Sequence, residues 1–158
     1  MSVQKAYNYN PTIGAAGGIV DLAPYEINTF LNEEDTGAMV FGVAVVAGTK
    51  PGVNVKLADA NGQFVGVTVN NRTTEYDIEG NIHIRHGKPL GVMAYGRIFA
   101  RLADGIEPEF GEQAYVITSG DEQGYFTNAS TGNKKINAKF VGKANNGVVE
   151  LELIHAME

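Results

Sequence analysis

The sequence predicts an all-β protein: an antiparallel β-sandwich or jelly-roll-like barrel with an extended N-terminal arm. Three observations predict this fold class. Apolar residues recur at every second position along much of the chain, which places them on one face of a strand. Turn-forming residues separate these runs at short intervals. The chain also holds 20 glycines in 158 residues, a density that leaves little room for long amphipathic helices.

The expected strands follow one another along the chain. Residues 39–46 are apolar on both faces, as is typical of a strand in the centre of a sheet. The later strands alternate, so we expect one face of each in the core and the other in solvent. Their inward-facing residues are expected to be Val65, Val67, Val69, Ile82, Ile84, Ile98, Ala100, Leu102, Ile136, Ala138, Phe140, Val149, Leu151 and Leu153.

The pair Asn146-Gly147 predicts a hairpin near the C-terminus. Both residues of an Asn-Gly pair accept positive φ, which a type I′ turn requires. We therefore expect residues 135–144 and 147–154 to form two antiparallel strands. Short strands at this spacing are typical of a sandwich or barrel, and the sequence leaves the strand order open.

Residues 1–36 are predicted to form an arm before a β-sandwich domain of residues 37–158. They lack sustained alternation. They contain a glycine cluster at residues 14–18, which we expect to be flexible, and an acidic run at residues 33–35, which we expect to be a solvated turn. The apolar residues between positions 22 and 31 could alternatively line one face of a short helix.

The apolar side chains of the arm predict an interface. A segment that carries so many would not remain bare on a monomer, so we expect it to pack on a neighbouring subunit or on a partner. Burying each such side chain contributes about 1.5–3 kcal/mol before ordering costs. The residues expected at this contact are Tyr7, Tyr9, Ile13, Ile19 and Val20.

A second candidate contact lies on the predicted strand around Phe99. Arg97 and Arg101 share a strand face with Phe99 between them. Together with His83 and Arg85 of another strand, this row could be a polar interaction surface. An ordinary solvent-facing row explains the pattern equally well, and both interpretations stay open.

Composition excludes several function classes. The chain has no cysteine, which removes disulfides, thiolate catalysis and thiolate metal sites. The net charge of −6 and the scattered basic residues argue against nucleic acid as a partner. No apolar run reaches the ~20 residues of a membrane helix, so we expect no membrane partner. The N-terminus shows no secretory signal, so we expect synthesis in a cytoplasm.

No catalytic, cofactor or metal site is expected. His83 and His86 would point to opposite faces of a strand, and no further ligands follow at zinc spacing. The carboxylates of Glu107, Glu109 and Glu112 could resemble the acid pair of a glycosidase. They surround a proline and a glycine, however, which indicates a solvated turn. We therefore expect a protein that is not an enzyme.

The order of the strand motifs resembles that of the structural cement, or decoration, proteins of tailed bacteriophages. The motifs that carry the resemblance are, in order, residues 39–45 (MVFGVAV), 64–69 (FVGVTV), 76–80 (YDIEG), 82–85 (IHIR), 91–98 (GVMAYGRI), 111–116 (GEQAYV), 124–127 (GYFT), 138–141 (AKFV) and 147–151 (GVVEL). Each motif is short, and the resemblance rests on their order and spacing.

The resemblance implies a non-enzymatic virion protein that binds the outer surface of a phage capsid. Its partner would be the major capsid protein, whose neighbouring subunits it would cement. It also implies synthesis in the cytoplasm of the bacterial host. The resemblance leaves the oligomeric state open, and we expect a homo-oligomer, either dimer or trimer, on the capsid. No catalytic residue is carried over.

Three other interpretations stay open at this point. Another phage virion structural protein, from the tail or the head–tail connector, would also be rich in strands and free of cysteine. A carbohydrate-binding β-sandwich module would favour stacked aromatic faces, whereas this chain has seven tyrosines and no tryptophan. A small hydrolase would need a pocket that holds acids with perturbed pKa values.

Overall fold

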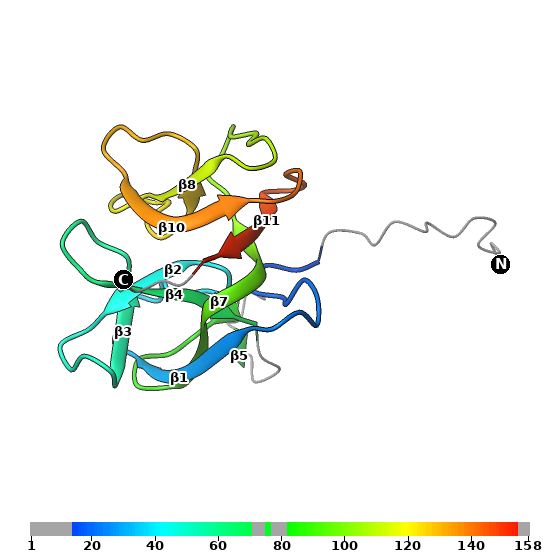
Figure 1. Cartoon of the computed structure of the whole chain (residues 1–158). Coiled ribbons are helices and arrows are strands. Elements are labelled where there is room, and N and C mark those ends of the chain that lie inside the picture. Colours follow the sequence, from blue (N-terminus) through cyan, green and yellow to red (C-terminus); the bar gives the residue numbers. More distant parts are fainter. Residues whose placement is uncertain (1–13, 71–74, 77–81, 155–158) are drawn as a thin grey trace, which may run out of the picture.

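Eleven strands and no helix make up the part of the chain that the computed structural model describes, residues 14–70, 75–76 and 82–154 (Figure 1). This result confirms the predicted all-β class. The strands are β1 (Glu26–Asn32), β2 (Ala44–Ala47), β3 (Asn54–Leu57), β4 (Phe64–Val69), β5 (Glu75–Tyr76), β6 (Ile82–His83), β7 (Pro89–Arg101), β8 (Gln113–Val116), β9 (Phe126–Thr127), β10 (Lys134–Phe140) and β11 (Val148–Leu153).

Nine of these strands form one sheet in the order β1-β3-β2-β4-β7-β11-β10-β8-β9. An additional pairing of β1 with β7 closes the first part of this sheet into a barrel of β1, β3, β2, β4 and β7. The pairing of β1 with β3 is parallel, and the other strand pairs are antiparallel. The barrel and the largely antiparallel pairing agree with the prediction.

Strand β7 links the barrel to a second layer. Figure 1 shows β8, β10 and β11 above β2, β3 and β4, with β7 passing through both parts. Leu102, just after the end of β7, forms a parallel bridge with Phe126 of β9. The last strand of the sheet therefore lies next to the end of β7. The 13-residue β7 is therefore the shared wall of the two layers.

The core consists of two apolar clusters on either side of β2. Ala44 and Val46 lie in the cluster between the barrel and the second layer, and Val45 lies in the cluster inside the barrel. All three are completely buried. This arrangement confirms a strand covered on both faces for residues 44–46, because a strand between two cores must be apolar on each side. The expected strand is wrong for residues 39–43, which form a turn and irregular backbone before β2.

The alternation predicted for the last strands is confirmed. The buried residues of these strands are Ile98, Ala100 and Leu102, then Ile136, Ala138 and Phe140, and finally Val149, Leu151 and Leu153. The terminal hairpin is also confirmed, with Asn146 at φ 52° and Gly147 at φ 75°. The N–H of Asn145 donates to the Val148 carbonyl oxygen at 2.9 Å, and the reciprocal bond measures 3.1 Å. Strand β10 ends at Phe140, earlier than predicted.

Strand β1 lies inside the segment predicted as an arm, and the helical alternative for its residues is wrong. Its backbone pairs with β7 over Glu26–Leu31, and Leu31 and Asn32 pair with β3. The half-buried side chains of Ile27 and Phe30 pack against different core clusters, which explains why no period of two was visible. Residues 26–32 thus contribute a strand to the barrel. That the residues before β1 form an arm stays a proposal.

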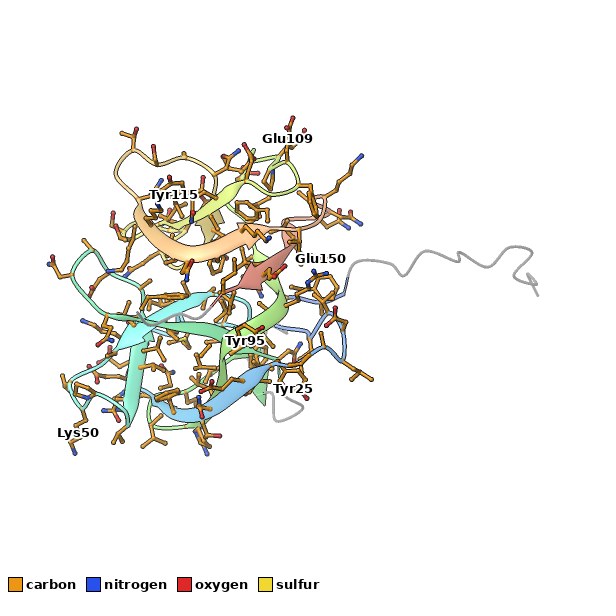
Figure 2. All side chains as sticks on the ribbon, viewed as in Figure 1. Tyr25, Lys50, Tyr95, Glu109, Tyr115 and Glu150 are labelled. Atoms are coloured by element: carbon orange, nitrogen blue, oxygen red, sulfur yellow. The ribbon has the colours of Figure 1, made fainter. Side chains whose placement is uncertain are left out.

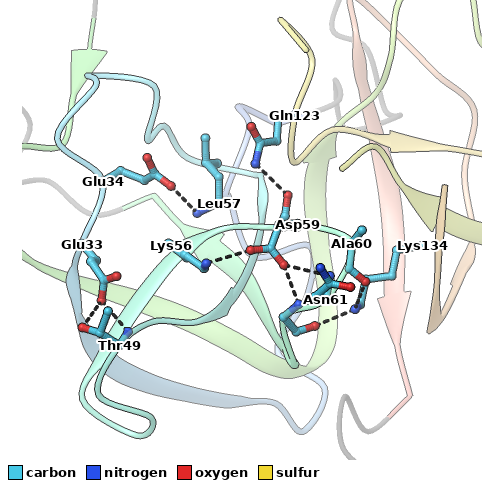
Figure 3. A network of polar contacts seen from close by, with 12 residues as sticks. Glu33, Glu34, Thr49, Lys56, Leu57, Asp59, Ala60, Asn61, Gln123 and Lys134 are labelled. Carbon is cyan, nitrogen blue, oxygen red and sulfur yellow. Dashed lines mark hydrogen bonds and ion pairs between the residues drawn. The ribbon is translucent and has the colours of Figure 1, made fainter. Parts of the chain in front are cut away.

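The acidic run after β1 stays accessible to solvent, and Glu33 and Glu34 also make hydrogen bonds that fasten the barrel (Figure 3). The Glu33 carboxylate accepts the Thr49 N–H at 2.7 Å and the Thr49 hydroxyl at 3.0 Å. The Glu34 carboxylate accepts the Leu57 N–H at 3.1 Å. These bonds connect the end of β1 to the β2–β3 hairpin. The bond from the Thr49 backbone holds the pKa of Glu33 below its usual value.

An ion pair continues this polar network along β3. Lys56 Nζ lies 2.7 Å from Asp59 Oδ2, and the other Asp59 oxygen accepts the Asn61 N–H at 3.1 Å (Figure 3). The hydrogen bond from Lys56 lowers the pKa of Asp59. Lys134 of β10 donates to the Gly62 carbonyl oxygen at 2.6 Å. The β3–β4 connection is thereby tied to the second layer.

Candidate functional site

The two halves of β7 have different neighbours. From Pro89 to Tyr95 the strand pairs with β1, and its residues 91–93 pair with β4 on the other edge. From residue 96 to 101 it pairs with β11 on one edge. No regular strand covers the other edge of this half in the described residues. Residues 17–20 lie along it instead.

Residues 17–20 are held on β7 by backbone hydrogen bonds. The Gly17 N–H donates to the Phe99 carbonyl oxygen at 2.7 Å, and the Phe99 N–H donates to the Gly18 carbonyl oxygen at 2.9 Å. The Val20 N–H donates to the Arg97 carbonyl oxygen at 3.2 Å, and Ile19 forms a bridge with Ile98. The expectation of a flexible glycine cluster is therefore wrong for Gly17 and Gly18, because their backbones are paired.

After Val20 the chain leaves β7 as an outward loop and returns at Glu26, opposite Tyr95. The Asp21 carboxylate accepts the Ala23 N–H at 3.0 Å and shapes the loop. The side chain of Leu22 is 95% exposed, that of Tyr25 45% and that of Ile19 38%. Three large apolar residues thus face solvent within one short segment.

Gly96 allows this loop to sit close to β7. Its φ is 121°, and a Cβ at this position would lie 2.7 Å from the Cβ of Tyr25. Only glycine accepts this conformation and this approach without strain. Tyr25 consequently lies over Gly96, next to Arg97, and Figure 2 shows Tyr25 and Tyr95 on the same side of the molecule. We call Ile19, Leu22, Tyr25 and Arg97 the N-terminal patch.

The two arginines of the predicted polar row differ in their surroundings. Arg97 is 44% exposed, and its Nη2 lies 3.3 Å from Oε2 of Glu152 on the paired strand β11. Arg101 is half-buried, and its Nε donates to the Phe41 carbonyl oxygen at 2.8 Å. Arg97 is therefore available at the surface, whereas Arg101 supports the loop before β2.

The predicted row does not extend across neighbouring strands to residues 83 and 85. Strand β6 pairs only with β5, in a separate two-stranded sheet of the described residues. The side chain of His83 lies outside the described part of the structure. Arg85 follows β6, and its carbonyl oxygen accepts Nδ2 of Asn32 at 3.2 Å. The backbone bonds thus place residues 19 and 20 beside Ile98 and Arg97 of β7, while Tyr7, Tyr9 and Ile13 lie outside the described residues.

The other candidates from the sequence show no assembled chemistry. Nδ1 of His86 lies 3.0 Å from the Glu33 carbonyl oxygen. Within the described ranges, no group of three or more His, Asp or Glu side chains is placed to hold a metal ion. The described residues also contain no helical span that could cross a bilayer.

The carboxylates of the β7–β8 loop have no catalytic geometry. Glu112 accepts the Glu109 N–H at 2.8 Å and Asn128 Nδ2 at 3.1 Å. The Glu109 bond is the main reason that the pKa of Glu112 is lowered, whereas the general acid of a glycosidase needs a raised pKa. A surface depression of about 370 Å³ is lined by Phe64, Gln113, Lys135, Ile136 and Asn137, none of them acidic.

Comparison with known families assigns the chain. The family model described as "Structural cement protein (E217 gp24/Pam3 gp6)" matches residues 3–154, which is nearly the whole sequence. The chain belongs to the phage structural cement protein family. This match confirms the resemblance drawn from the order of the strand motifs. No curated protein sequence matches the chain significantly.

A solved structure shares the fold of this cement protein. A chain in "The capsid of Myoviridae Phage XM1" superimposes with a TM-score of 0.73 at 18% identity, covering 99% of this chain and 100% of that one. Membership of the cement family makes the protein a structural component of the phage virion that cements the capsid.

Tyr25 and Phe110 are exposed residues that the sequence did not indicate as contacts, and Leu22 was expected to pack on a partner only as one of the apolar residues of the arm. Asp21 and Pro24 mark the loop that displays Leu22 and Tyr25. Phe110 is 79% exposed in the β7–β8 loop. It stands among acidic and turn-forming residues, a sequence context that could have indicated an exposed aromatic side chain.

Proposed function

We propose that this cement protein binds the outer surface of an assembled phage capsid and bridges neighbouring subunits of the major capsid protein. The N-terminal patch is the proposed contact. The observation that carries this assignment is the exposure of Leu22, Tyr25 and Ile19 on a loop that is held at both ends by β7. Large apolar side chains exposed within one short loop are candidates for a protein contact.

In this proposal the contact also includes residues that come before the N-terminal patch in the sequence. Tyr7, Tyr9 and Ile13 precede the patch in sequence and would add apolar area on the same capsid subunit. Val20 contributes through its backbone bond to Arg97, and Arg97 supplies a charge at the rim. Arg101 acts indirectly, because its side chain holds the Phe41 carbonyl group.

Weak individual contacts suffice for such a role. A capsid presents many identical sites, and a protein that touches two subunits at once gains from effective concentration. A dimer or trimer of the cement protein would multiply this gain, and we propose such an oligomer on the capsid. The role needs no catalytic centre, and we propose that the protein has none.

Co-sedimentation with purified capsids that lack the protein tests the proposal. The Leu22→Ser variant should bind at least tenfold more weakly than the wild type, as expected for a central interface residue. Val53→Ser is the matched control, because Val53 is an exposed apolar residue on the β2–β3 turn, away from the patch. Equal binding by both variants and the wild type would refute the patch. Binding to isolated tails and not to capsids would instead support a role as a tail or connector protein.

A further inference from the structure

The β7–β8 loop presents a second exposed aromatic side chain. We call residues 104–112 the acidic loop. Its Phe110 is 79% exposed, the highest exposure of any large apolar residue of the described chain after Leu22. Figure 2 shows Glu109 at the opposite end of the molecule from Lys50 and well separated from Tyr25. The acidic loop and the N-terminal patch are therefore distinct surfaces.

The acidic loop is held in place next to Phe110. The Gly111 N–H donates to the Phe140 carbonyl oxygen at 2.7 Å, and the Phe140 N–H donates to the Glu112 carbonyl oxygen at 2.9 Å. The Glu112 carboxylate closes the turn by accepting the Glu109 N–H at 2.8 Å. Pro108, in the same loop, is buried. A side chain displayed on such a turn is preorganised, so little conformational entropy is lost when it binds.

The charged side chains of the acidic loop itself have one sign, and the neighbouring strand β10 places Lys139 opposite Gln113 at the end of the loop. Residues 102–133 contain no Lys or Arg. Within the acidic loop, Glu107 and Glu109 are exposed beside Phe110. The carboxylates of the acidic loop are those of Asp104, Glu107, Glu109 and Glu112. An apolar tip inside a negative field is complementary to an apolar pocket with a positive rim.

We propose that the acidic loop is a second capsid-binding element. Phe110 inserts into an apolar pocket rimmed by Lys or Arg on a capsid subunit other than the one that the N-terminal patch contacts. This inference rests on the proposed cementing function. A protein that bridges two subunits needs two separated contact surfaces, and these are the two places where the described chain exposes its large apolar side chains most fully.

The test measures binding of the purified full-length protein to capsids that lack it, at about 50 mM and about 500 mM salt. Phe110→Ala should weaken binding at least tenfold at both salt concentrations. Glu109→Gln should weaken binding severalfold at low salt and have little effect at high salt, because the rim charges are screened. Asp121→Asn is the matched control, since Asp121 is exposed but lies outside the acidic loop. Circular dichroism should show all three variants folded.

The outcomes separate this inference from the proposed function. If the wild type binds capsids and Phe110→Ala binds equally well, the acidic loop is not a contact and the cementing proposal stands. If the wild type does not bind at all, both proposals fail. If Phe110→Ala dissociates an oligomer in sedimentation equilibrium and leaves capsid affinity unchanged, the loop contacts a second copy of the chain, which also overturns the inference.

Discussion

The two halves of strand β7 have different roles: the first stabilises the core, and the second supports the loop that exposes the proposed contact residues. Its first half, Pro89–Tyr95, has strands on both edges and places Leu90, Val92 and Met93 in the core. Its second half has a regular strand on one edge and the short segment 17–20 on the other. The loop that follows this segment exposes Leu22 and Tyr25. Regular pairing stabilises one half, and interrupted pairing presents the contact residues on the other.

The largest difference between the halves should appear when leucines are truncated. Leu90→Ala in the first half should lower the free energy of unfolding by about 2–5 kcal/mol, because it leaves a cavity in the barrel core. The same change at Leu22 should stay within about 0.5 kcal/mol, because that side chain is in solvent. Urea unfolding of both variants measures the contrast. Equal losses would mean that Leu22 packs on the protein.

Two truncations test how much the segment 17–20 contributes. Removing residues 1–20 deletes the backbone bonds to Phe99 and Arg97 and should cost about 2–4 kcal/mol, at about 1 kcal/mol for each bond lost. A chain that begins at residue 14 keeps these bonds and should retain more stability. Comparing the urea unfolding midpoints of the two truncated proteins measures the contribution of residues 17–20. Identical midpoints would show that the segment is dispensable for β7.

A change at Gly96 should disturb the boundary between the halves. Gly96→Ala should lower the free energy of unfolding by about 1–3 kcal/mol, because φ is 121° and the new Cβ would collide with Tyr25. Gly105→Ala, at a turn with open space around it, separates the cost of positive φ from that of the collision. A loss at Gly96 no greater than at Gly105 would contradict the role of the close approach.

Acid should weaken the barrel through the carboxylates that fasten it. The folded pKa of Glu33 is lowered from 4.5 and that of Asp59 from 3.8. Their stabilisation is therefore complete above these values and is lost as the pH falls through the lowered folded values. Glu33→Gln should reduce the melting temperature at pH 7 and have a smaller effect near pH 3. A pH-independent difference between the variant and the wild type would contradict this linkage.

The sequence predicted the later strands well and the N-terminal third poorly. Strands β10 and β11 each face one core and solvent, so a period of two was visible in their side chains. Strand β1 packs Ile27 and Phe30 on different clusters and has a register shift between Glu26 and Ile27, which together hide that period. The barrel closure depends on the long-range pairing of β1 with β7, which no local pattern encodes.

The candidate contact stays a prediction. Ile19, Val20 and Arg97 were singled out from the sequence, and the structure adds that the backbone of residues 19 and 20 lies along the second half of β7. Arg101 was singled out by its strand face, and only the position of the Phe41 carbonyl reveals its structural bond. Leu22 was expected at the contact only as one of the apolar residues of the arm, without its exposed loop. Its exposure follows from a loop whose shape depends on the Asp21 side chain and on Gly96.

Binding to assembled capsids tests the cementing role most directly. Purified protein is added to capsids that lack it, and the bound amount and the capsid melting temperature are measured together. We expect saturable binding at a defined ratio to the major capsid protein, with a rise in the capsid melting temperature that the Leu22→Ser variant fails to produce. An unchanged melting temperature at full occupancy, or no saturable binding by the wild type, would contradict the account.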